Sequence, residues 1–206
     1  MAVPVTKPTL TPDDFSRAAL RLACDIAAVK AVAAVESRGS GFLPDGQPVI
    51  LFERHIFHRL TKGRWTDRRG DLGDGTGYYL YRDISNPVRG GYGSEGQHQH
   101  DRLAKAAKLD RSAALQSASW GMFQIMGFNY QLAGHETLQS FINAMYRSEG
   151  DHLDAFVEFN ISEGLDKYLR AHRWSAYARR YNGTAYARNQ YHTRLATAWK
   201  RFSKEG

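Results

Sequence analysis

The sequence contains very little cysteine and no long apolar run. Cys24 is the single cysteine among 206 residues, so an intramolecular disulfide is excluded, and a disulfide-stabilised scaffold with it. No segment reaches the roughly 20 apolar residues that a membrane-spanning helix needs. The N-terminal stretch lacks the apolar core of a secretory signal. The sequence therefore predicts a soluble protein that is made in the cytoplasm and folds in a reducing compartment.

Motifs of several enzyme classes are also missing. The chain has no GxxxxGK[ST] and no GxSxG pattern, which disfavours phosphate-loop and serine-hydrolase chemistry. The histidine pairs His55/His58 and His98/His100 lack the second pair of ligands that a structural zinc site needs, and His135 begins no HExxH motif. We therefore expect these histidines to be packing or surface residues, and we expect no metal and no cofactor.

The positive charge is concentrated at one end of the chain. Residues 170–206 hold nine Lys and Arg against one acid, Glu205, whereas the preceding 169 residues are close to neutral. A basic segment attracts polyanions without specifying which one, although the same pattern also describes a solvated helical face. Recognised nucleic-acid motifs are absent and the charge is not spread along an aromatic groove, so we expect no nucleic-acid partner.

The length and composition fit one globular domain, which we expect to span residues 1–206 with 1–11 as an extension. Apolar spacing predicts a helix that starts at Pro12, capped by Thr11, and a second that starts at Ile26 and runs toward Glu36. Further helices are predicted at 102–108, 137–146, 152–160, 174–181 and 191–202. The fold class is therefore mainly α.

One stretch of the chain differs from this helical pattern. Residues 47–60 predict a short strand that passes into a helix. Residues 63–96 hold nine of the 19 glycines, interleaved with tyrosines, and predict an irregular or β excursion. Such a composition suits saccharide or peptide contact, and it also occurs in plain surface loops.

Glu36 is the first candidate for chemistry. It falls in or just beyond the last turn of its predicted helix, which stops at Gly39-Ser40-Gly41. An acid at that end faces the negative pole of the helix dipole, which favours the protonated form. The position is poor for a structural glutamate and good for an acid that must carry a proton.

Three short motifs occur in a fixed order along the chain: Glu36-Ser37, Ser119-Trp120-Gly121-Met122-Phe123-Gln124-Ile125, and Tyr181-Asn182-Gly183. Together they resemble the signature of the lysozyme-like superfamily, which holds soluble lytic transglycosylases and goose-type lysozymes. Over the longer stretches 33–42, 50–58 and 119–127 the chain is more closely similar to the N-acetylmuramidase domain of phage endolysins.

This resemblance implies a two-lobed, lysozyme-like helical domain with a glycan cleft. Relatives often carry an N-terminal wall-binding module, and we expect no separate module of this kind in residues 1–206. The implied activity is hydrolysis of the β-1,4 bond between N-acetylmuramic acid and N-acetylglucosamine in bacterial peptidoglycan. We expect a monomer that acts on the wall in the periplasm. The basic C-terminal segment would bind an anionic outer-membrane or lipopolysaccharide surface.

The resemblance also implies roles for residues. Glu36 would be the general acid. For the second carboxylate we choose Glu53, because alternation along residues 49–53 turns it away from Phe52 toward a cleft; a salt bridge to a neighbouring arginine is the alternative. Asp71 and Asp74 are rivals, since goose-type lysozymes use aspartates from the loop region.

The remaining site residues are those expected to contact glycan. Gln124 and Tyr181 match the glycan-contacting positions of the family, and Tyr181 would hold either the Glu36 carboxyl or a sugar hydroxyl. Asn182 would form the turn beside it. Ser119 would hydrogen-bond near the acid or cap a helix. Two other activities stay open: a lytic transglycosylase that leaves 1,6-anhydro ends, and a non-enzymatic binder of polyanions.

Overall fold

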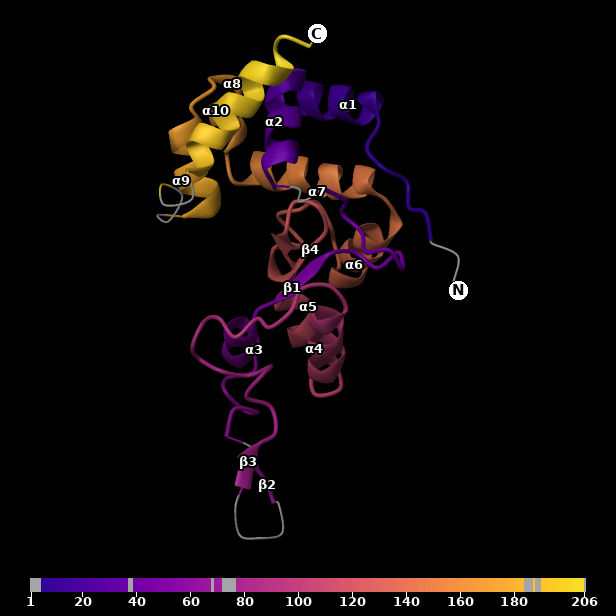
Figure 1. Cartoon of the computed structure of the whole chain (residues 1–206), viewed down its shortest axis with the longest axis vertical. Helices are drawn as coiled ribbons and strands as arrows, with labels where there is room; N and C mark the ends of the chain where they lie inside the picture. The colour runs from indigo at the N-terminus through magenta and orange to yellow at the C-terminus, as the bar shows by residue number, and fades with distance from the viewer. Residues whose placement is uncertain are drawn as a thin grey trace.

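The computed structural model describes residues 5–36, 39–67, 69–71, 77–183, 187 and 190–205, with the side chains of 71, 77, 78 and 182 left out. Helices dominate, and they divide the molecule into two parts (Figure 1). The helical lobe contains α1 (Pro12–Leu22), α2 (Ile26–Glu36), α7 (Glu149–Ser162), α8 (Asp166–Arg170), α9 (Trp174–Asn182) and α10 (Tyr191–Phe202). In Figure 1, α7 forms the side of this lobe that faces the rest of the chain.

The other part, the sheet lobe, is built around a three-stranded antiparallel sheet. Its order is β1 (Ile50–Phe52), β4 (Ala118–Trp120), β5 (Ile125–Met126), and Leu51 pairs with Ser119. The helices α3 (Arg54–Leu60), α4 (Gln97–Ala107), α5 (Arg111–Gln116) and α6 (Leu138–Arg147), with the 3-10 turn Gly127–Asn129, accompany it. A hairpin of β2 (Arg69–Asp71) and β3 (Gly77–Tyr79) projects from the far end (Figure 1).

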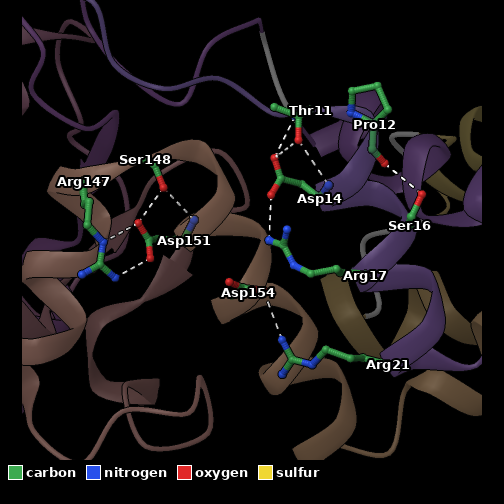
Figure 2. A network of polar contacts seen from close by, with 10 residues as sticks. All are labelled: Thr11, Pro12, Asp14, Ser16, Arg17, Arg21, Arg147, Ser148, Asp151 and Asp154. Atoms are coloured by element: carbon green, nitrogen blue, oxygen red, sulfur yellow. Dashed lines mark hydrogen bonds and ion pairs between the residues drawn. The ribbon is translucent and has the colours of Figure 1, made fainter.

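The start of α1 shows how local sequence fixes a helix. Thr11 accepts a hydrogen bond from the Asp14 backbone N–H, and the Asp14 carboxylate accepts one from the Thr11 N–H, which completes a capping box (Figure 2). Further along α1, Arg21 donates to Asp154 of α7 at 3.1 Å. Surface ion pairs of this kind contribute about 0–1 kcal/mol, so the apolar face of α1 supplies most of the packing energy.

The core of the helical lobe forms around α2. This helix is apolar on nearly all sides, and Ala28, Val29 and Val32 are fully buried. It packs against α1 on one side and α10 on the other. An apolar helix flanked in this way is expected to be buried, and its C-terminal end is thereby held at a fixed place in the fold.

Most of the predicted elements are confirmed. The helices that start at Pro12 and Ile26 and the strand-to-helix passage within 47–60 are present. Of the five later helices, the one at 191–202 has the predicted ends, and the other four have ends that differ by at most five residues. The short helices α5 and α8 and the strands β4 and β5 were missed, whereas β2 and β3 lie in the stretch 63–96 that was expected to be irregular or β. Elements this short span too few turns or alternations to show a period in sequence. No helix in the described ranges is both long and apolar enough to cross a membrane.

Candidate active site

Glu36 is the last residue of α2 and is half-buried. The hydroxyl of Tyr191, the first residue of α10, donates a hydrogen bond to Glu36 Oε1. Tyr191 is itself buried, so this contact forms where α10 packs on α2. The expected position of Glu36 in the final helical turn is confirmed, and the carboxyl group is oriented by a phenol from the far end of the chain.

Two further tyrosines lie near this carboxyl group. The rings of Tyr177 and Tyr181 on α9 stack with centroids 5.4 Å apart. Burial, followed by the charge of Glu36, raises the pKa of Tyr181 well above its ordinary value. Tyr181 therefore stays protonated, and its hydroxyl donates to the Phe123 carbonyl at 3.1 Å.

The contact between Tyr181 and Phe123 joins the third motif to the second. Residues Gly121–Gln124 form the tight turn between β4 and β5, and Gln124 adopts a left-handed backbone with φ 51°. Ser119 Oγ donates to Gln124 Oε1 at 2.7 Å, and Gln124 Nε2 donates to the Gly121 carbonyl at 2.9 Å. A non-glycine residue in this conformation is strained, and these bonds hold it in place. Ser119 lies in a strand and caps no helix.

Glu53 lies in a different environment, in the sheet lobe. It directly precedes α3, and only 8% of its surface is exposed. Tyr92 donates to its Oε1 at 3.2 Å, and His55 Nδ1 lies 3.0 Å from its Oε2. Among the described residues, this histidine, and neither Arg54 nor Arg59, lies within ion-pair distance of the Glu53 carboxyl group.

The buried guanidinium of Arg102 lies close enough to Glu53 to interact with its charge. Arg102 donates to the carbonyl of Phe52 at 3.1 Å and to that of Asp83 at 2.6 Å. Burial lowers the pKa of Arg102, and burial followed by the Glu53 charge raises that of Tyr92. None of these neighbours of Glu53 is among the contacts described above for Glu36.

The side chains of three other candidate residues are not described by the structure. Asp74 lies outside the described residues, and for Asp71 and Asn182 only the backbone, in β2 and α9, is described. Among the described residues, no group of three or more histidine, cysteine or acidic side chains is arranged to hold a metal ion. Residues 91–96 read GxGxxG, but the chain before them is irregular and is not a strand, so the dinucleotide-binding context is absent there.

Comparison with known proteins decides the family. The sequence model named Muramidase, described as N-acetylmuramidase, matches residues 25–203. The chain belongs to the N-acetylmuramidase family. It is accordingly a peptidoglycan-cleaving enzyme of the lysozyme type. None of the curated proteins that were searched matches it.

A solved structure extends this family assignment to the fold. The crystal structure of the Burkholderia AP3 phage endolysin aligns with a TM-score of 0.84 and 41% sequence identity, over 97% of this chain and 73% of the endolysin chain. The mainly α, lysozyme-like fold expected from the sequence is confirmed, as is the resemblance to phage endolysin muramidases.

Sequence reasoning missed one residue that contacts Glu36 in this candidate site. Tyr191 holds Glu36, a role that the motif pattern offered to Tyr181 as one of two alternatives. Tyr191 lies 155 residues from Glu36 and outside all three motifs. The pairing depends on α10 packing against α2, and the sequence carries no local signal of that contact.

Proposed function

We propose that the chain hydrolyses the β-1,4 bond between N-acetylmuramic acid and N-acetylglucosamine of peptidoglycan, with Glu36 as the general acid. The observation that carries this proposal is a chain of contacts that links Glu36 to the other two motifs. Tyr191 donates to the Glu36 carboxyl group, the charge of Glu36 reaches Tyr181, and Tyr181 bonds the Gly121–Gln124 turn. Membership of the N-acetylmuramidase family supports the choice of bond.

In this mechanism Glu36 gives its proton to the glycosidic oxygen as the sugar develops oxocarbenium character. Tyr191 donates to Glu36 Oε1 and would orient the carboxyl group for this transfer. The stacked rings of Tyr177, which is fully buried, and Tyr181, which is half-buried, would limit the access of water to this part of the site.

For the glycan contacts we propose Gln124, Ser119, Tyr181 and Asn182. The Gln124 carbonyl oxygen accepts from Ser119 and keeps a second acceptor position, which suits the N–H of a sugar acetamido group. Ser119 keeps acceptor capacity on its hydroxyl. The strained turn that carries Gln124 is supported by Tyr181, so this turn would present a fixed surface to the sugar.

For the second carboxylate we propose Glu53, which would activate water or attack the sugar. Its support is a buried position beside Tyr92, His55 and the Arg102 guanidinium, since a guanidinium attracts a negative charge. A separation of about 5–5.5 Å between the two catalytic carboxyl groups indicates retention, and about 6.5–9.5 Å indicates inversion. Asp71 and Asp74 remain the rivals of Glu53 for this role.

A lytic transglycosylase is the second candidate, because such an enzyme needs only one carboxyl group. The observation in its favour is that the contacts described for Glu36 and for Glu53 come from different parts of the fold. This activity would leave 1,6-anhydro-muramic ends, whereas hydrolysis leaves reducing N-acetylmuramic acid.

The test of the general acid is Glu36→Gln. We expect activity on purified peptidoglycan to fall by about 10²–10⁴-fold, the usual contribution of a general acid. Glu163→Gln is the matched control, because Glu163 is exposed at the end of α7, and it should keep full activity. Full activity of the Glu36 variant would remove Glu36 from this role.

We also propose that the basic C-terminal segment binds an anionic outer-membrane or lipopolysaccharide surface. Arg179, Arg180 and Arg201 are exposed on α9 and α10, where such a surface could reach them. Changing all three to Glu should weaken lysis of whole cells and spare digestion of purified wall. An equal loss on both substrates would contradict this partner.

A further inference from the structure

The buried carboxylate of Glu149 plays no part in the chemistry proposed above. Glu149 is the first residue of α7, and only 4% of its surface is exposed. Its Oε1 accepts from the Gly41 N–H at 2.7 Å and from Ser40 Oγ at 3.1 Å, and its Oε2 accepts from the Leu10 N–H at 3.2 Å. A buried carboxylate is costly unless it is well hydrogen-bonded, so this set of donors indicates a specific role.

The turn that carries Glu149 is itself firmly anchored. Ser148 caps α7 by accepting from the Asp151 N–H at 3.1 Å, and Arg147 pairs with the Asp151 carboxylate (Figure 2). The Glu149 N–H donates to the Pro8 carbonyl at 3.0 Å. The carboxylate is therefore presented from a fixed helix start and not from a flexible loop.

One helical turn later, on the same face of α7, the buried side chain of His152 contacts the second motif. Its Nδ1 accepts from the Met122 N–H at 3.1 Å, and its Nε2 donates to the Met145 carbonyl at 2.8 Å. Gly41 and Gly121 both lie against the ring: a Cβ atom would come within 2.6 Å of Nδ1 at Gly41 and within 2.8 Å at Gly121. This face of α7 thus contacts both the segment that follows Glu36 and the turn that carries Gln124.

We infer that Glu149 is a positioning residue that sets Glu36 against the Gly121–Gln124 turn. The inference rests on the proposed role of Glu36. The chain leaves α2 at Glu36, and four and five residues later Ser40 and Gly41 are bound by the Glu149 carboxylate. Because His152 binds the turn from the same helix face, α7 fixes both parts of the site in one frame.

The test is Glu149→Gln, compared with Glu163→Gln, which makes the same chemical change at an exposed position of the same helix end. A glutamine has one acceptor oxygen, so it cannot accept from both Leu10 and the Ser40–Gly41 segment. With soluble, uncross-linked peptidoglycan strands as substrate, we expect kcat to fall by about tenfold or more, KM to stay within twofold, and unfolding to remain cooperative. The control should match the wild type.

A second variant guards against a simple loss of folding. Ser40→Ala removes one of the three donors from an exposed loop residue, and it should lower kcat by a few-fold with an unchanged Tm. The inference is overturned if kcat of Glu149→Gln equals that of the control, or if kcat per folded molecule is normal in both variants. A fully active Glu36→Gln would instead overturn the proposed general acid, whatever Glu149→Gln does.

Discussion

Two glutamates, one in each lobe, stand at the end of an apolar segment of the chain, and their surroundings differ. Glu36, in the helical lobe, ends α2 and contacts the tyrosine hydroxyl of Tyr191, with Tyr181 beside it. Glu53, in the sheet lobe, lies against Tyr92 and His55, and the guanidinium of Arg102 is within electrostatic reach. Each glutamate accepts from a tyrosine hydroxyl, but only Glu53 also has a histidine beside it and a guanidinium within electrostatic reach, which favours a carboxylate there. This difference is the basis on which we propose Glu36 as the proton donor and Glu53 as the second carboxylate.

The substitution Glu53→Gln should cause the largest loss of activity among the tests of the two glutamates. If Glu53 acts on water or on the sugar, the variant should lose activity on purified peptidoglycan by about 10²-fold or more. The measurement is kcat on soluble peptidoglycan strands, with circular dichroism to verify the fold. Near-normal activity would remove the second carboxylate and favour the transglycosylase, or transfer the role to Asp71 or Asp74.

The substitution Tyr191→Phe sharpens the comparison on the side of Glu36. Removing the hydroxyl leaves the ring packing and deletes the donor to Oε1. We expect kcat to fall by about tenfold, which corresponds to about 1.4 kcal/mol in the barrier. Tyr168→Phe, at a half-buried tyrosine of α8, is the control and should keep normal kcat. An unchanged kcat in Tyr191→Phe would show that the orientation of Glu36 does not depend on this phenol.

A smaller effect concerns the helix between the two lobes. Burial lowers the pKa of His152. As pH falls below about 6.5, this histidine therefore becomes protonated in the unfolded chain while it is still neutral in the folded protein. The unfolded state then binds more protons, and the free energy of unfolding should fall as pH drops below about 6.5 and stay level above it. His152→Gln should flatten this dependence between pH 5 and 6.5. Part of the slope should remain, because burial also lowers the pKa of His135.

Denaturant unfolding at a series of pH values measures this effect. His98→Gln is the control, since His98 is exposed, and it should leave the slope as it is. A slope that is identical in His152→Gln and the wild type would contradict the assignment to His152.

Sequence patterns were sufficient for the features that are local. The end of α2 at Glu36, the Thr11 cap and the strand-to-helix passage before Glu53 each depend on a few neighbouring residues, and each was expected. The motif order was sufficient for the family, because three ordered motifs are far more specific than one. The helices α5 and α8 are too short for their apolar residues to show a helical period in the sequence.

What could not be predicted depends on contacts between distant segments. Tyr191 reaches Glu36 across 155 residues, and Glu149 reaches Gly41 across 108. Both contacts require helix packing that no motif encodes. The contact between Glu53 and Tyr92 has the same origin, because strand alternation gives the side of the strand that Glu53 faces but not the distant residue that meets it there.

The most direct test of the account is mass spectrometry of the fragments released from purified peptidoglycan by the wild type and by Glu36→Gln. The account predicts fragments that end in reducing N-acetylmuramic acid from the wild type and almost none from the variant. Fragments with 1,6-anhydro-muramic ends would contradict hydrolysis, and equal release by the variant would contradict Glu36 as the acid.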